Sequence, residues 1–216
     1  MALSFPLARA DFFDLLPIAR ITLRPNDSRT FTETAGGELI PAGRAVPLWR
    51  GSIALDKERH RLFAELESKL TLLEQTGASF LLYDPRQPFP AADPGGAILG
   101  QATPMISALA ANNREIDLSG LPAGYEISAG DLIGWTYGAA PTRYALHRVV
   151  TGATASGSGT ARDIELAPFL RPGLALNTPV TLVRPLCKAV LEEAEYGGGR
   201  SVITEGTTFK WRQTLR

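Results

Sequence analysis

The stretch that most restricts the fold is residues 47–90, PLWRGSIALDKERHRLFAELESKLTLLEQTGASFLLYDPRQPFP. Its middle predicts one amphipathic helix over residues 57–76, because apolar side chains recur there at every third or fourth position. Asp56 is expected to cap the start of this helix, and Gly77 is expected to follow its last turn. A helix with one apolar face lies on a sheet. Its predicted apolar stripe consists of Leu62, Leu66, Leu70 and Leu73, with Phe63 beside them.

The helix is followed by a short apolar strand, which is expected over residues 79–84. Prolines at positions 85, 88 and 90 stop this strand, because proline lacks the amide hydrogen that a sheet requires. Residues 93–96, DPGG, form a turn-rich link, and a domain boundary is placed near them.

Beyond that link, glycine, proline and small polar residues divide the chain into short segments, a pattern typical of antiparallel β proteins. The connection at residues 151–160, TGATASGSGT, contains no packing residues and is expected to be a mobile hairpin tip. Five short strands at this spacing predict a small barrel or sandwich. The expected strands are residues 115–118, 132–137, 144–150, 161–166 and 180–184.

The two ends of the chain are predicted to share a sheet. Residues 18–24 alternate apolar and polar side chains, and the C-terminal strands can rejoin the sheet that they begin. We therefore expect a discontinuous domain of residues 1–95 plus 186–216, with residues 96–185 inserted as a second domain. The C-terminal strands are expected at residues 189–193, 201–204 and 208–215, the last as a half-buried or edge strand.

Composition excludes several classes of protein. The chain has 22 Lys plus Arg and 22 Asp plus Glu, so a general electrostatic attraction to nucleic acid is not expected. No stretch approaches the roughly 20 apolar residues of a membrane span, and the first residues do not resemble a signal peptide. The single cysteine, Cys187, lies in an apolar run and is expected to be a buried thiol.

The sequence offers little catalytic chemistry. His60 is expected on the polar side of the helix and His147 in a strand, without the spacing of a metal site. The segment ASGSGTA resembles a nucleophile elbow only in part, because it lacks the flanking strand and helix. GGGR at residues 197–200 is expected to be a turn. We expect no catalytic residue, cofactor or metal; the scattered acids are Asp84, Asp93, Glu115 and Asp131, of which the first two are expected to cap turns.

Two stretches resemble a family of tail structural proteins from siphophages and related prophages. In residues 47–90 the resemblance lies in a strand with a Trp-Arg pair, an amphipathic helix, and an apolar strand that ends in DPRQP. In residues 116–186 it lies in AGDLIGW, RYALHRVV and GSGTARDIELAPFLRP. Residues 1–46 show no such match.

The resemblance implies a distal-tail-type or tail-tip protein. Such a protein combines a tail-tube-like β-sandwich, flanked by the helix, with an inserted small β-barrel that projects outward. It forms a ring, commonly sixfold, which joins the tail tube to the hub or baseplate of the virion. It is made in the cytoplasm of the host bacterium. The implied partners are further copies of the chain, the tail tube protein and the hub or baseplate protein, with neither nucleic acid nor membrane insertion; an enzyme is not expected.

Assembly contacts are expected where sheet edges and the polar stretch at residues 26–45 can meet a neighbour. That stretch is either a long hairpin or an exposed loop. The candidate contacts are Phe31, Trp49, Phe209 and Trp211.

Two other functions remain open. In a receptor- or carbohydrate-binding tail module, Trp135, Tyr137 and Tyr144 of the inserted domain would form a stacking surface. In a tail-associated hydrolase, a pair of the acidic residues would carry the chemistry.

Overall fold

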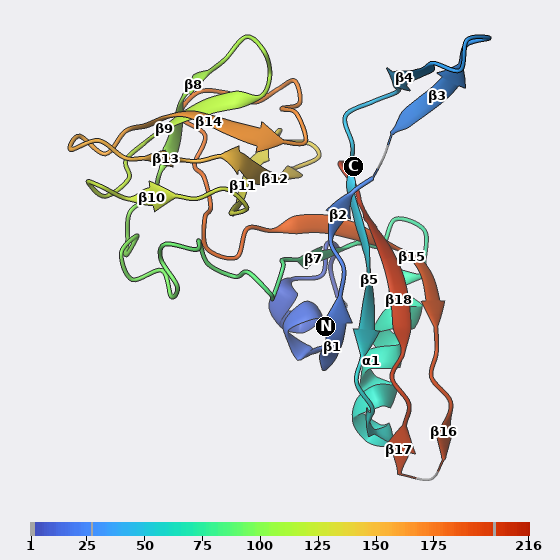
Figure 1. Cartoon of the computed structure of the whole chain (residues 1–216). Helices are drawn as coiled ribbons and strands as arrows, with labels where there is room; N and C mark the ends of the chain where they lie inside the picture. The colour runs from blue at the N-terminus through green and yellow to red at the C-terminus, as the bar shows by residue number, and fades with distance from the viewer. Residues whose placement is uncertain (1–2, 27, 201) are drawn as a thin grey trace.

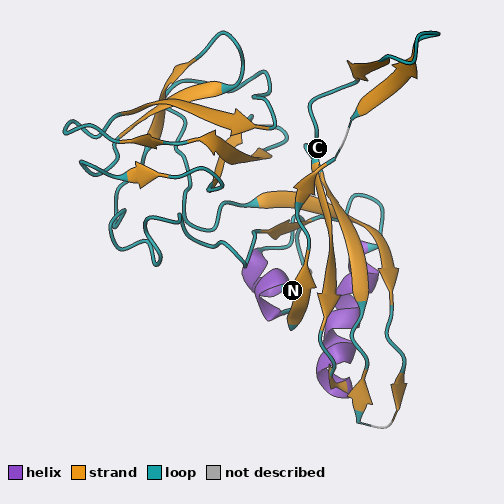
Figure 2. Ribbon diagram, in the orientation of Figure 1, coloured by secondary structure: helices purple, strands orange, loops and turns teal. Residues whose placement is uncertain are grey.

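The protein is mainly β, as predicted, with 41% of its residues in strands and 9% in helices. The computed structural model describes residues 3–26, 28–200 and 202–216. Figure 1 and Figure 2 show two sheet-built units and a separate two-stranded hairpin that stands away from both.

The first sheet combines strands from both ends of the described chain, in the order β1-β5-β18-β15-β7, with β2 also paired to β5. All of its strand pairs are antiparallel. β18 lies at the centre of this sheet and alternates buried with less buried residues, so of the two predicted forms of residues 208–215 the half-buried strand is confirmed and the edge strand is wrong. The strands are β1 (Ile18–Ile21), β2 (Arg24–Pro25), β5 (Trp49–Leu55), β7 (Phe80–Leu82), β15 (Cys187–Glu195) and β18 (Thr208–Gln213).

One face of the first sheet is covered by α1 (His60–Leu73) and by two 3-10 turns, η1 (Arg9–Asp11) and η2 (Phe13–Leu15). Their apolar side chains and those of the strands form a single buried cluster. The rings of Phe12 and Phe80 meet edge to face, with centroids 5.2 Å apart, an arrangement that aromatic pairs favour. The largest buried side chains of this cluster are Trp49, Trp211, Phe12, Phe13, Phe63, Phe80 and Phe209.

The helix is shorter than predicted. It begins at His60, because the two residues before it form β6 (Glu58–Arg59), which pairs with β17 (Ile203–Thr204). Asp56 is therefore not its N-cap, and its carboxylate accepts a hydrogen bond from the neighbouring Lys57 amide. The predicted stripe was also wrong at Leu62, which is 51% exposed, while Phe63 is fully buried. Leu62 lies in the first turn of the helix, at the edge of the apolar stripe, where it is only half covered.

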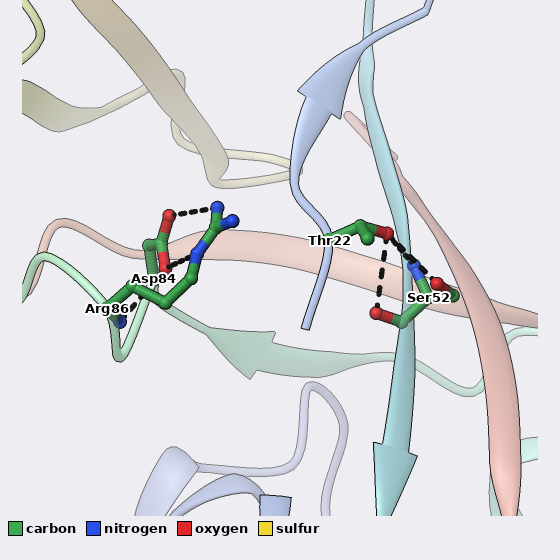
Figure 3. Close-up of polar contacts among 4 residues, drawn as sticks. All are labelled: Thr22, Ser52, Asp84 and Arg86. Carbon is green, nitrogen blue, oxygen red and sulfur yellow. Dashed lines mark hydrogen bonds and ion pairs between the residues drawn. The ribbon is translucent and has the colours of Figure 1, made fainter. Parts of the chain in front are cut away.

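The predicted strand over residues 18–24 divides into β1 and β2 at a close crossing (Figure 3). There the Thr22 side-chain oxygen accepts from the Ser52 amide (2.8 Å) and lies 2.9 Å from the Ser52 hydroxyl. A Cβ at Gly51 would lie 1.8 Å from the Thr22 carbonyl oxygen, so only glycine permits this approach. The side chain of Thr22 thus replaces a backbone acceptor where the edge strand bends.

The second sheet is a curled half-barrel with the order β11-β12-β14-β9-β8. Four of its five predicted strands are present with small shifts at their ends, and one further strand, β8, was not predicted. The strands are β8 (Met105–Leu109), β9 (Glu115–Ser119), β11 (Leu132–Tyr137), β12 (Arg143–Thr151) and β14 (Ala161–Ala167).

Residues 177–181 hydrogen-bond to both edge strands of this half-barrel. Ile106 of β8 donates to the Thr178 carbonyl, and Gly134 of β11 exchanges two backbone hydrogen bonds with Thr181. The predicted strand at residues 180–184 is wrong, because this segment makes only isolated bridges and turns away at Arg184, whose φ is 49°.

The connection at residues 151–160 is packed, contrary to the expectation that it lacks packing residues. It contains β13 (Ala153–Thr154), which pairs with β10 (Glu126–Ile127). Ala155 is buried, and a Cβ at Gly159 would lie 2.2 Å from the Leu121 carbonyl oxygen. Small residues are present here because the segment lies against a neighbouring loop.

Two short hairpins complete the described fold. GGGR was expected to be a turn, but its end forms β16 (Gly199–Arg200), which pairs with β17 in a separate three-stranded sheet that also contains β6. The polar stretch at residues 26–45 is a hairpin, one of its two predicted forms. Its strands are β3 (Arg29–Glu33) and β4 (Leu39–Gly43).

The two units meet through the outer face of β11 and β12. Leu132 and Leu146 lie on this face and belong to the first core. The indole nitrogen of Trp49 donates to the Leu146 carbonyl (2.5 Å). Gln213 accepts from the Trp49 amide (3.1 Å) and donates to the Tyr144 carbonyl (2.9 Å), so one side chain joins β5, β18 and β12.

The proline-rich segment after β7 forms a second tie between the units. Asp131, which is buried, accepts hydrogen bonds from the Gln87 side chain (3.1 Å) and the Ala91 amide (2.8 Å). In the same segment Asp84 and Arg86 form a bidentate ion pair (Figure 3). The Arg86 Nε atom donates to Asp84 Oδ1 (2.9 Å) and the Arg86 Nη2 atom donates to Asp84 Oδ2 (2.7 Å). DPRQPFP therefore connects the units as an ordered strap.

Gln213→Leu should destabilise the protein by about 2 to 4 kcal/mol, because it leaves the buried Trp49 amide and the Tyr144 carbonyl without partners. Urea denaturation followed by tryptophan fluorescence measures this change. Gln101→Leu, at an exposed position, is the matched control and should change stability by less than about 0.5 kcal/mol. Equal stability of the two variants would refute the role given to Gln213.

Candidate functional site

The β3–β4 hairpin, which we call the arm, is the most exposed element of the described fold. Every residue of β4 is exposed, and in β3 only Thr30 is partly covered. Figure 1 shows the arm projecting beyond the ends of β2 and β5, away from both units. Its two strands pair with each other and with no other strand among the described residues.

The arm exposes apolar side chains on both of its faces. Phe31 lies opposite Pro41 on one face, whereas Ile40 lies opposite Thr32 on the other. Phe31, Leu39 and Ile40 are 48%, 57% and 51% exposed. A two-stranded hairpin is marginally stable alone, and apolar side chains gathered at such a place mark an interaction surface. The arm is thus the best candidate for a contact with another chain.

The other three candidate contacts lie elsewhere. Trp49, Phe209 and Trp211 have no exposed surface in the chain and form the middle of the first core. They cannot reach a partner without opening that core. Of the four candidates, the structure leaves only Phe31 on the surface.

Leu39 and Ile40 are arm residues that were missed. Their signal in the sequence is an apolar pair that follows Gly36-Gly37 and precedes Pro41, in a stretch otherwise polar. Their exposure could not be inferred, because the same pair in a paired sheet would be buried.

The three candidate glycan contacts are separated by the pleat of the second sheet. Trp135 and Tyr137 point to its inner face, where they are 5% and 9% exposed. The Trp135 ring stacks on His147, with centroids 4.6 Å apart. Tyr144 pairs with Thr136 and lies on the outer face, where it is partly exposed. The structure does not bring the three aromatic rings together into one stacking surface.

Three of the four acidic residues weighed for hydrolysis, Asp84, Asp93 and Asp131, serve as hydrogen-bond acceptors. Asp84 accepts from the Arg86 amide, and Asp93 accepts from the amides of Ile98 (3.0 Å) and Leu99 (2.9 Å), so the turn-capping predictions are confirmed. Burial opposes ionisation of Asp93, but these amides outweigh it, and the pKa of Asp93 lies below its ordinary value. A carboxylate held ionised by amides is a poor proton donor.

The histidines and the cysteine are dispersed. His60 contacts the Thr204 hydroxyl (2.9 Å), and Cys187 is fully buried, which raises the pKa of its thiol. Within the described ranges, no group of three or more His, Cys, Asp or Glu side chains is arranged to hold a metal ion. In the same part of the chain, no helix is long and apolar enough to cross a membrane.

A scan against protein-family models finds no match, and a search of curated proteins finds no significant match either. The resemblance to tail structural proteins therefore rests on the sequence patterns alone.

His147 should make stability depend on pH. It is 4% exposed, one ring nitrogen contacts the Pro168 carbonyl (2.7 Å), and burial lowers its pKa to about 4 from the ordinary 6.5. Between pH 6.5 and 4 the unfolded chain therefore binds a proton that the folded chain does not. Stability should fall as the pH drops through this window, by about 1.4 kcal/mol per pH unit.

Denaturation of the native protein and of His147→Gln at pH 7.0, 6.0 and 5.0 measures this contribution. The difference in stability between the two proteins should shrink as the pH falls, because glutamine does not titrate. A constant difference across the series would contradict the prediction.

Proposed function

We propose that this chain is a structural subunit of a bacteriophage tail, forming a ring at its distal end that joins the tail tube to the hub or baseplate. The observation that carries the proposal is the arm, which holds Phe31, Leu39 and Ile40 largely exposed on a hairpin that pairs with no other strand of the described fold. The resemblance to tail structural proteins indicates that the assembly is a ring of the phage tail.

The edges of the first sheet support a head-to-tail contact. Leu7 forms a parallel bridge to Phe80, so the β7 edge is already occupied by its own chain. β1 lies at the opposite end of the sheet, with β5 as its only strand neighbour in the described fold. An arm from one copy can add to this edge in the next copy, and a repeated contact between unlike surfaces closes a ring when the rotation fits.

The finer architecture belongs to the same proposal. The first sheet with its helical cover corresponds to a tail-tube-like β-sandwich domain, built from residues 1–95 plus 186–216. The half-barrel corresponds to an inserted β-barrel domain of residues 96–185, which projects outward. Support comes from the joining of both chain ends in one sheet and from residues 177–181, which bond to both edges of the other.

The remaining parts of the proposal follow from the ring. The chain would act in the virion at the tail tip, after synthesis in the host cytoplasm, and would bind copies of itself, the tail tube protein and the hub or baseplate protein. It would have no catalytic role and would contact neither nucleic acid nor membrane as a partner.

A variant with Phe31→Ser, Leu39→Ser and Ile40→Ser should remain folded but lose assembly. A stable ring buries more than about 1,000 Å² at each interface, and these side chains are the apolar part of the proposed contact. Light scattering after size-exclusion chromatography should give a closed oligomer for the native chain and a monomer for the variant. The melting transition of the monomeric unit should be unchanged, because the arm lies outside both cores.

Leu176→Ser is the matched control, because Leu176 is 54% exposed but lies outside the arm. It should assemble as the native chain does. A native chain that is monomeric at high concentration and absent from tail particles would refute the proposed function. An oligomer that survives the triple substitution would instead refute the role of the arm.

A further inference from the structure

A groove of about 490 Å³ lies where the two units meet, on the outer face of β11 and β12. Thr136 and Tyr144 form its floor, since they pair across these strands on the side away from the second core. Arg9 of η1 and Phe89 of the strap form one wall, and residues 179–186 contribute the other. Neither unit contains the groove by itself.

The only formally charged side chains that line the groove are two arginines, Arg9 and Arg184. Both guanidinium groups lie near the ring of Tyr83, at 5.9 and 5.6 Å from its centroid. Two cations beside one ring repel each other, so the arrangement favours an anion between or beside them. No carboxylate lines the groove.

Arg184 is available to such an anion. It is exposed and forms no ion pair among the described residues, and its guanidinium stacks near Phe89 at 5.9 Å. Its φ of 49° is strained for a side-chain-bearing residue, and its amide is held by the Pro88 carbonyl. The Nη1 atom of Arg9 is buried, lies 3.6 Å from the Asp14 carboxylate and makes no hydrogen bond, so Asp14 partly balances the charge of Arg9. The backbone and the two aromatic rings thus hold Arg184 at the groove, while no carboxylate among the described residues pairs with its charge.

The rest of the lining suits a ring with several hydroxyl groups. Thr136, Thr181 and Tyr144 line the groove, and their hydroxyls make no hydrogen bond within the described part of the chain. The rings of Tyr144 and Phe89 add flat apolar surface, on which a sugar ring can stack. An extended acidic peptide would need a free strand edge, but β11 already pairs with β12 and with Thr181.

We propose that this groove binds an acidic sugar, a saccharide ring that carries a carboxylate, as part of a surface polysaccharide. Arg184 holds the carboxylate by a charge-assisted hydrogen bond, with Arg9 adding to the positive potential. Tyr144 and Phe89 contact the ring, and the threonine hydroxyls bond to its hydroxyl groups. The site does not depend on assembly into a ring, because every lining residue comes from one chain.

Trigalacturonic acid and its fully methyl-esterified form are suitable probes, because esterification removes the negative charge of each carboxyl group and keeps the sugar rings with their hydroxyl groups. Calorimetric titration of the full chain should show binding of the acid and at least tenfold weaker binding of the ester. Arg184→Gln should weaken binding of the acid at least tenfold, and Thr136→Trp, which fills the groove from an exposed strand position, should abolish it. Arg162→Gln, at an exposed position on β14, is the control and should bind as the native chain does.

Several outcomes would overturn the proposal. The native chain could fail to bind the acid, or could bind the acid and the ester equally well. Arg184→Gln or Thr136→Trp could bind the acid as the native chain does. A polyglutamate peptide of equal charge could bind more tightly than the acid. Thermal denaturation of each variant establishes that it is folded before titration. Titration of the variant with Phe31→Ser, Leu39→Ser and Ile40→Ser, which should bind the acid as the native chain does, separates loss of the sugar site from loss of assembly.

Discussion

The position of the two units depends on the hydrogen bonds that Gln213 and Trp49 make to β12. The outer face of β12 is partly removed from water by the first core, so its carbonyl groups at Tyr144 and Leu146 need donors from that core. The Gln213 amide and the Trp49 indole supply them, at 2.9 and 2.5 Å. Since Leu146 also packs in the first core, apolar burial and hydrogen bonding fix the same orientation. The units consequently share a core, and the groove between them has defined walls.

The arm, unlike the contact between the two units, is not stabilised by burial of apolar side chains. Its strands satisfy each other's backbone groups but bury almost none of its side chains. Folding of the chain alone gives Phe31, Leu39 and Ile40 little stabilisation, since little apolar surface leaves the water. Their stabilisation has to come from a second surface, which is why the arm carries the proposed assembly. The groove differs in that its lining residues are already brought together within one chain.

The aromatic residues show why a local sequence pattern does not identify the residues that contact a partner chain or a glycan. Phe209 and Trp211 alternate with charged residues, a pattern that fits an edge strand with one covered face and equally fits a central strand. Only the neighbours of β18 decide between these, and those neighbours, β5 and β15, come from separate parts of the chain. Trp135, Tyr137 and Tyr144 were grouped by residue type, yet strand pairing places Tyr144 on the face opposite to the other two. The sequence did not indicate Arg184 as a binding residue. No local pattern identifies a cation that comes close to η1 and the strap only after folding.

Local sequence patterns predicted an amphipathic helix, with bounds wider than those of α1, most strands of the second sheet and the turn-capping aspartates, and they left residues 26–45 as either a hairpin or a loop. These features follow from side-chain period, proline and glycine placement and short-range hydrogen bonds. Tertiary packing alone settled which residues are covered: β18 became central, Leu62 is half exposed in the first turn of α1, and residues 177–181 bonded to two strand edges without forming a strand. Burial and pairing depend on partners far away in the chain, and a local pattern does not specify which partner it will meet.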